Sequence, residues 1–170
     1  DKIEGNVVLI DKSPKKCKFL QDLSNKLSLI LKIENLRLED YKFNKISTDK
    51  KIGIKIDIEG NEYEIGDKLV DQIKKRTSNI RFIVIEFHNV SKNRDRFLSL
   101  TKSIQSYLSV AHVHANNFGG IGPDGFPEVI EITFSSAITL RESKVLQNPN
   151  GSFDKPCNPL LDDLDLIFLV

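Results

Sequence analysis

The stretch that decides the fold is IGIKIDIEGNEYEIGDKLVDQIKKRTSNIRFIVIEF, residues 52–87. It begins and ends with short apolar runs rich in Ile and Val, Ile52–Ile58 and Arg81–Phe87, which are typical of buried parallel strands. Between them, apolar residues recur at helical spacing, with charged residues on the other side. These apolar residues are Ile65, Leu69, Val70 and Ile73. The strand–helix–strand order predicts a parallel sheet in an α/β fold.

Segments downstream extend this unit. Apolar spacing predicts a helix over Arg94–Leu108, and Val110–Ala115 reads as the next strand. After a stretch rich in turn residues, Glu128–Ser135 predicts one more strand. The last two strands are close enough in sequence to pair antiparallel.

Segments at the two ends predict further elements. Asn6–Ile10 reads as a strand, Lys15–Leu31 as a helix, and Leu36–Tyr41 as a short strand or its exit. The apolar tail, residues 164–170, predicts a terminal strand. At 170 residues we expect one domain, residues 1–170.

Composition indicates which classes of binding partner to expect. Lys and Arg total 25 against 24 Asp and Glu, so a net charge of +1 argues against nucleic acid or a membrane as the main partner and favours a small or neutral molecule. No apolar run approaches the roughly 20 residues that span a bilayer, and the first residues lack a signal-peptide pattern. Cys17 and Cys157 form no C-x-x-C pattern. We expect a cytoplasmic protein with reduced thiols, and the oligomeric state is not indicated.

Polar side chains gather where three of the predicted strands end. They are Asp57 and Glu59 after the first, Glu86 and His88 after the second, and His114, Asn116 and Asn117 after the third. Ligands bind at the carboxyl ends of strands in open α/β sheets, so these residues predict a site at one edge of the sheet. Side chains two apart on a strand face the same way, which places each strand's pair on one face.

Structural roles compete with this interpretation. A single acid at a strand end often caps a helix or joins an ion pair, and Glu59 and Glu62 fit that role as well as a site. His88 and His114 also fit a structural role, and His112, nearer the middle of its strand, is predicted to lie in the core.

The pair Asn116 and Asn117 precedes two glycines and fits a hairpin turn as well as a ligand contact to sugar or amide groups.

The sequence lacks the motifs of several reaction classes. It contains no G-x-G-x-x-G, no Walker loop, no Cys/His cluster with zinc spacing and no G-x-S-x-G, which excludes nucleotide hydrolysis and serine hydrolase chemistry.

Four segments together resemble the FkbM-type S-adenosylmethionine-dependent methyltransferases. They are KIDIEGNEYE (residues 55–64), FIVIEFHN (82–89), HVHANNFGG (112–120) and PEVIEITF (127–134). LRLEDY (36–41) also resembles the acidic segment that precedes the first of these, so the resemblance spans residues 36–136. It implies a Rossmann-like class I methyltransferase sheet, mostly parallel with an antiparallel C-terminal strand pair. The implied reaction transfers a methyl group to a hydroxyl of a sugar or other small metabolite.

The resemblance also implies cofactor contacts. Asp57 would border the methyl-transfer centre, Asp11 resembles the acid that binds the ribose hydroxyls of S-adenosylmethionine, and Glu39 or Asp40 would lie near the adenine. The family's glycine-rich cofactor motif has no counterpart here, since the first fifty residues contain Gly5 alone. We therefore expect that the N-terminal part of the sequence is incomplete.

Methyl transfer requires an aligned acceptor oxygen and a base for its proton. Asp57, His88 and His114 are the predicted catalytic residues, with Asp57 or His88 as the base. Glu59, Asn116 and Asn117 are predicted to bind the acceptor.

Two other functions fit the same residues. One is a metal-dependent enzyme with Asp57, Glu86, His88 and His114 as ligands, although we do not expect a metal for methyl transfer itself. The other is a binding module that kept the methyltransferase fold without catalysis, as the missing glycine motif suggests.

Overall fold

The computed structural model describes residues 6–11, 31–34, 51–136, 156–164 and 166, with backbone alone for the first two ranges. Its elements follow one another in the order β1 (Asn6–Asp11), β2 (Leu31–Glu34), β3 (Ile52–Asp57), α2 (Gly66–Arg76), β4 (Ile80–His88), α3 (Arg94–Gln105), β5 (Ser109–Ala115) and β6 (Val129–Ser135). The five strands and two helices predicted within the described residues are all present, with bounds that differ by a few residues.

These strands form a single six-stranded sheet in the order β2-β1-β3-β4-β6-β5. The pairs β1–β2, β1–β3 and β3–β4 are parallel, and β6 runs antiparallel to both β4 and β5. The mostly parallel sheet with its antiparallel β5–β6 pair confirms the predicted Rossmann-like fold of the class I methyltransferase type.

The chain changes direction across the sheet between β1 and β3. From β1 it passes outward to β2 and returns to β3 on the other side of β1. The strands β1 and β3 end level with each other, because Asp11 and Asp57 are register partners. In open α/β sheets the ligand site lies beyond the carboxyl ends of the strands at such a reversal. The topology therefore places a ligand site beside the ends of β1 and β3.

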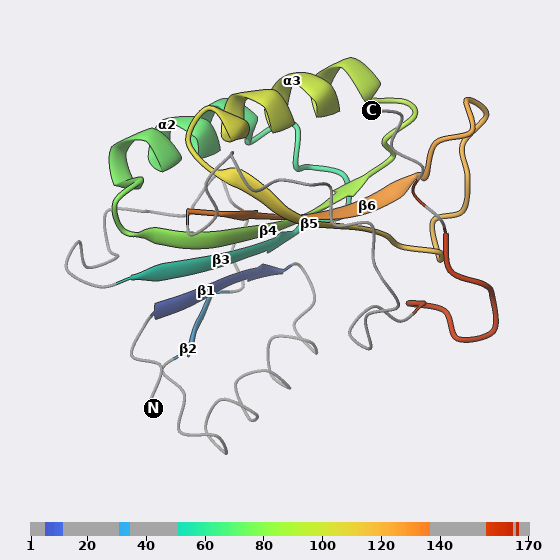
Figure 1. The fold of residues 1–170 in the computed structure, drawn as a ribbon, viewed down its shortest axis with the longest axis horizontal. Coiled ribbons are helices and arrows are strands. Elements are labelled where there is room, and N and C mark those ends of the chain that lie inside the picture. Colours follow the sequence, from blue (N-terminus) through green and yellow to red (C-terminus); the bar gives the residue numbers. More distant parts are fainter. Residues whose placement is uncertain (1–5, 12–30, 35–50, 137–155, 165, 167–170) are drawn as a thin grey trace.

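One face of the sheet carries the hydrophobic core. Figure 1 shows α2 and α3 side by side over this face. The sheet contributes mostly Ile and Phe side chains, and the helices contribute Leu69, Ile73, Phe97, Leu100 and Ile104. Phe87 meets Phe97 edge-on, with ring centroids 5.1 Å apart. Burying each large apolar side chain contributes about 1.5–3 kcal/mol, so this packing stabilises the helices against the sheet.

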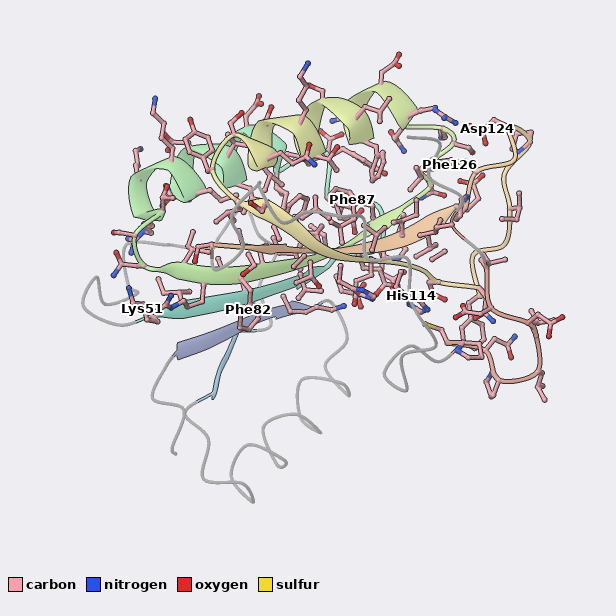
Figure 2. The ribbon with its side chains drawn as sticks, in the orientation of Figure 1. Lys51, Phe82, Phe87, His114, Asp124 and Phe126 are labelled. Carbon is pink, nitrogen blue, oxygen red and sulfur yellow. The ribbon has the colours of Figure 1, made fainter. Side chains whose placement is uncertain are left out.

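The other face of the sheet is polar over β3, β4 and β6. Alternation along the strands turns Lys55, Glu86 and Glu131 away from the helices, each only partly buried. In Figure 2, Phe87 lies on the helix side of the sheet, whereas Phe82 and His114 lie on the opposite side. Ionisable side chains thus share one face, as the alternation of the sequence predicts.

The observed α2 begins at Gly66, directly after Ile65, the first residue of its apolar spacing. Residues 62–65 form turns, and Glu62 among them folds back onto the end of β3. Asp67 lies in the first turn of α2 and Lys74, Lys75 and Arg76 lie in its last turn, an order that favours the helix dipole. Because α2 begins after these turns, Glu62 lies at the end of β3 and not in the helix.

Some predicted elements fall outside the described residues. The helix predicted over Lys15–Leu31 does so except for Leu31, which belongs to β2 and is therefore wrongly assigned. The segment Leu36–Tyr41 and residues 165 and 167–170 of the tail also lie outside the described parts. None of the helices described in the structure is long and apolar enough to cross a membrane.

Candidate functional site

The imidazole of His88 stands at the centre of a group of carboxylates at the carboxyl ends of β3 and β4. Its Nδ1 lies 3.0 Å from Glu62 Oε1. Its Nε2 lies 3.6 Å from Glu59 Oε2 and 3.9 Å from both Asp57 Oδ1 and Glu86 Oε1. Asp57, Glu59, Glu86 and His88, all predicted from their strand-end positions, are thus brought together.

Glu62 orients the ring of His88 through its Nδ1. Its side chain is 1% exposed, and its Oε1 accepts backbone N–H bonds from Ile58 at 3.2 Å and Gly60 at 3.1 Å. Burial alone raises the pKa of Glu62, but the bonds from His88 and the backbone outweigh it and the pKa is lowered. Glu62 is therefore a buried, ionised anchor that fixes both the β3 exit and the ring of His88.

The pKa of His88 is shifted by the same neighbours. Burial lowers it, but the hydrogen bond to Glu62 and the charges of Glu62, Glu59 and Glu86 act in the opposite direction, and the net result is a raised pKa. The surrounding carboxylates therefore stabilise the protonated imidazole.

The backbone at both strand exits adopts left-handed conformations. Glu59 has φ 55° and Asn89 has φ 52°, and Gly60, next to Glu59 in the chain, has φ 98°. A Cβ at Gly60 would lie 3.1 Å from Asn89 Nδ2, so the two exits approach closely. Tyr63 ties them further by donating its hydroxyl proton to the carbonyl of His88 at 3.0 Å. Non-glycine residues held in this region commonly mark functional sites.

A polar row crosses the sheet beside the His88 group. Glu86, Glu131 and His114 are register partners on β4, β6 and β5. Lys55 lies 3.6 Å from Glu86 Oε2 and forms a close ion pair with Glu131. The row therefore contains its own compensating cation.

Asn116 and Asn117 both use their amides within the chain. Asn116 donates to Glu86 Oε1 at 2.8 Å and accepts from the backbone of Phe118 at 3.0 Å, so it borders the site and also forms a turn. Asn117 is 3% exposed, and it binds the backbone of the segment 156–162 through Asn158 and its neighbours at 2.6–3.4 Å. The predicted acceptor contact of Asn117 stays a prediction.

His114 and His112 lie apart from the His88 group. The strand β6 separates β5 from β4, and His114 Nε2 faces Asp163 Oδ1 at 3.4 Å. The rings of His112 and His114 stack with centroids 6.5 Å apart. The prediction of a core position for His112 is wrong, because β5 presents it half-buried on the polar face of the sheet.

The structure describes the remaining predicted residues only in part. Asp11 ends β1 beside Asp57, with its backbone alone described, and Glu39 and Asp40 lie outside the described residues. For a metal, the ligand atoms of Asp57, Glu59 and His88 lie within 4.8 Å of one another. Among the described residues, Glu59 thus takes the place that the predicted ligand set gave to Glu86 and His114.

Two residues at the site carry more weight than the sequence indicated. Glu62 was left open between a helix cap and a site residue, and its position two residues after Gly60 in KIDIEGNEYE was the available signal. Lys55 gave a second signal, because a cation inside an apolar strand needs acidic partners on the same face, which Glu86 and Glu131 supply.

No protein-family model matches the sequence, and no curated protein is significantly similar to it. The FkbM-type resemblance is thus not confirmed and stays a prediction.

Solved structures resemble the chain at low identity. A S-adenosylmethionine-dependent methyltransferase from Clostridium acetobutylicum shares 8% identity over 77% of this chain and 83% of its own, with a TM-score of 0.43. The fibrillarin pre-rRNA processing protein of Methanococcus jannaschii shares 9% over 79% and 67%, with 0.42. TehB from Haemophilus influenzae shares 9% over 78% and 58%, with 0.36. With such TM-scores, these likenesses add nothing to what the sheet topology itself shows.

Proposed function

We propose that the chain is the core of a S-adenosylmethionine-dependent methyltransferase that methylates a hydroxyl group of a sugar or other small molecule. The observation that carries the proposal is the position of the His88 group. His88, held by the buried Glu62, stands with Asp57 at the strand ends next to the reversal between β1 and β3. This is where an open α/β sheet binds its ligand.

Methyl transfer makes few chemical demands on the protein. The acceptor oxygen attacks the methyl carbon in line, the bond from carbon to the sulfonium breaks, and the acceptor's proton passes to a base. His88 or Asp57 is that base. When the imidazole takes the proton, Glu59 and Glu86 at 3.6–3.9 Å stabilise the resulting charge.

Neighbouring residues supply the contacts to the two substrates. Glu59, with its side chain 60% exposed, and Asn116, bonded to Glu86, are placed to orient an acceptor hydroxyl. Asp57 borders the transferred methyl group, and Asp11, Glu39 and Asp40 remain the proposed contacts to the ribose and adenine. The near-neutral net charge of +1 favours a small acceptor over nucleic acid.

Binding of the demethylated cofactor tests the proposal directly. S-adenosylhomocysteine titrated into the purified protein in a calorimeter should bind at one site per chain. Transfer of labelled methyl groups from S-adenosylmethionine to a panel of sugars and hydroxylated metabolites should then identify the acceptor. A protein that binds neither cofactor form contradicts the proposal and favours the non-catalytic binding module.

Variants separate the base from general damage to the fold. Asp57→Asn and His88→Gln should each lower turnover while S-adenosylhomocysteine still binds. Glu64→Gln is the matched control, because Glu64 follows Glu62 closely but is 68% exposed and pairs with Arg96 at 2.8 Å. Wild-type turnover in both site variants would refute the assignment of the base.

A further inference from the structure

Four carboxylates surround the ring of His88 at the carboxyl ends of β3 and β4. Asp57, Glu59, Glu62 and Glu86 all lie within 3.9 Å of its ring nitrogens. Among the described residues, Lys55 contacts this group through Glu86 alone and shares its charge with Glu131. Carboxylates gathered in a partly buried place repel one another, and a bound cation relieves that cost.

The ligand atoms are already spaced for an ion. Nε2 of His88 lies 3.6 Å from Glu59 Oε2 and 3.9 Å from Asp57 Oδ1, and the three ligand atoms lie within 4.8 Å of one another. Around a divalent ion bound at about 2.1 Å, neighbouring ligands are about 3 Å apart and opposite ligands about 4.2 Å. The separations of His88 Nε2 from Glu59 Oε2 and from Asp57 Oδ1 fall inside this range.

The far side of the imidazole has the arrangement that metal-binding histidines need. Nδ1 faces Glu62 Oε1 at 3.0 Å, which directs Nε2 toward Asp57 and Glu59. A carboxylate behind the ring fixes its orientation and strengthens the other nitrogen as a ligand. In addition, Oε2 of the buried Glu62 has no hydrogen-bond partner among the described residues, so Oε1 makes the hydrogen bonds that hold this anion behind the ring.

We propose that Asp57, Glu59 and His88 bind a divalent cation at the carboxyl ends of β3 and β4, with Glu62 as the positioning residue behind His88. One imidazole with two carboxylates suits a first-row ion such as Mn²⁺. Glu59 is 60% exposed, so the site opens to solvent on its side and leaves coordination positions for water or an acceptor oxygen. The role of the ion rests on the proposed function: it would lower the pKa of a bound acceptor hydroxyl, whose proton would then pass to solvent, so that in the ion-bound protein Asp57 and His88 hold the ion in place of acting as the base.

Direct titration with Mn²⁺ tests the site without methyl donor or acceptor. Chelator-treated protein should bind one Mn²⁺ per chain, measured by the loss of the free-ion signal in electron paramagnetic resonance. Glu59→Gln, an exposed substitution that leaves the core untouched, should weaken binding by about tenfold or more, and His88→Gln by at least as much. Glu62→Gln keeps a carbonyl oxygen behind the ring and should weaken binding by about tenfold. Glu64→Gln should bind like the wild type.

The outcomes separate this inference from the proposed function. Binding of Mn²⁺ without any binding of S-adenosylhomocysteine supports the metal site and refutes the methyltransferase. Methyl transfer that persists in chelator-treated protein with no stoichiometric Mn²⁺ site overturns the metal site alone. Equal Mn²⁺ affinity in the wild type, Glu59→Gln and His88→Gln also overturns it, because the ion then binds elsewhere.

Discussion

The exits of β3 and β4 and the exit of β5 carry similar polar residues, yet the structure uses them differently. At the first, carboxylates converge on the ring of His88. At the second, Asn117 binds the backbone of the segment 156–162 and His114 faces Asp163. Polar residues after a strand therefore predict a site where several of them converge on one ionisable group, as around His88, and not where they hold a distant segment of the chain.

Substitutions at the two groups of strand exits should differ most in their effect on turnover. If the His88 group is the reacting centre, His88→Ala lowers the rate constant for methyl transfer by about a hundredfold or more, the usual contribution of a positioned base. His114→Ala should change it only a few fold, since its partner at 3.4 Å is Asp163 and β6 separates it from His88. Equal losses in single-turnover measurements would show that His114 is catalytic, as its place at a strand end predicts.

The free energy of unfolding should depend strongly on Glu62, which anchors the exit of β3. Glu62→Ala removes the acceptor of the Ile58 and Gly60 N–H groups and the partner of His88. Buried donors left without acceptors cost roughly 1–3 kcal/mol each, so we expect a loss of about 3 kcal/mol in the free energy of unfolding. Glu64→Ala, at an exposed neighbouring position, should stay within about 0.5 kcal/mol. Chemical denaturation measures both, and similar values would contradict the anchoring role.

Substitution of Asn117 at the exit of β5 should destabilise the segment 156–162, which Asn117 binds. Asn117→Ala deletes the bonds to Asn158, Leu161 and Asp162, and we expect a loss of about 1–2 kcal/mol. Hydrogen exchange should rise over residues 156–162 and stay unchanged over 57–62. Asn116→Ala is the control, because its bonds go to Glu86 and Phe118. Faster exchange over 57–62 in Asn117→Ala would mean that the two exits are coupled.

The sequence predicts the fold well where periodicity is strong. Ile or Phe occupies every second position on the buried face of β3, β4 and β6, so the strand faces and the grouping of Asp57, Glu59, Glu86 and His88 follow from spacing alone. Parallel strands end at one edge whatever their loops do. This is why the candidate site was found without knowledge of the tertiary contacts.

Spacing cannot show how a turn folds back or which partner an amide chooses. The return of Glu62 onto Ile58 and Gly60 depends on backbone angles near Gly60, and the sequence could not separate it from a helix cap. The contacts of Asn117 and His114 depend on a segment about forty residues downstream. Non-local contacts of this kind leave no periodic pattern, and they decide which strand-end residues serve as a site and which as a tether.

The smallest expected effect concerns the backbone at the first exit. Among the described residues, Glu59 and Asn89 are the non-glycine residues with positive φ, and both lie at the ends of β3 and β4. A left-handed conformation costs a residue with a Cβ about 1 kcal/mol, so Glu59→Gly should be more stable than Glu59→Ala by about that amount. At Glu64, where φ is not positive, the order should reverse, because glycine there only adds freedom to the unfolded chain. If denaturation gives the same order at both positions, the β3 exit stores no strain. If the order of the Gly and Ala variants at position 59 is opposite to that at position 64, the left-handed backbone that holds Glu59 beside His88 destabilises the fold by a measurable amount. The exit of β5 has no such residue among the described positions.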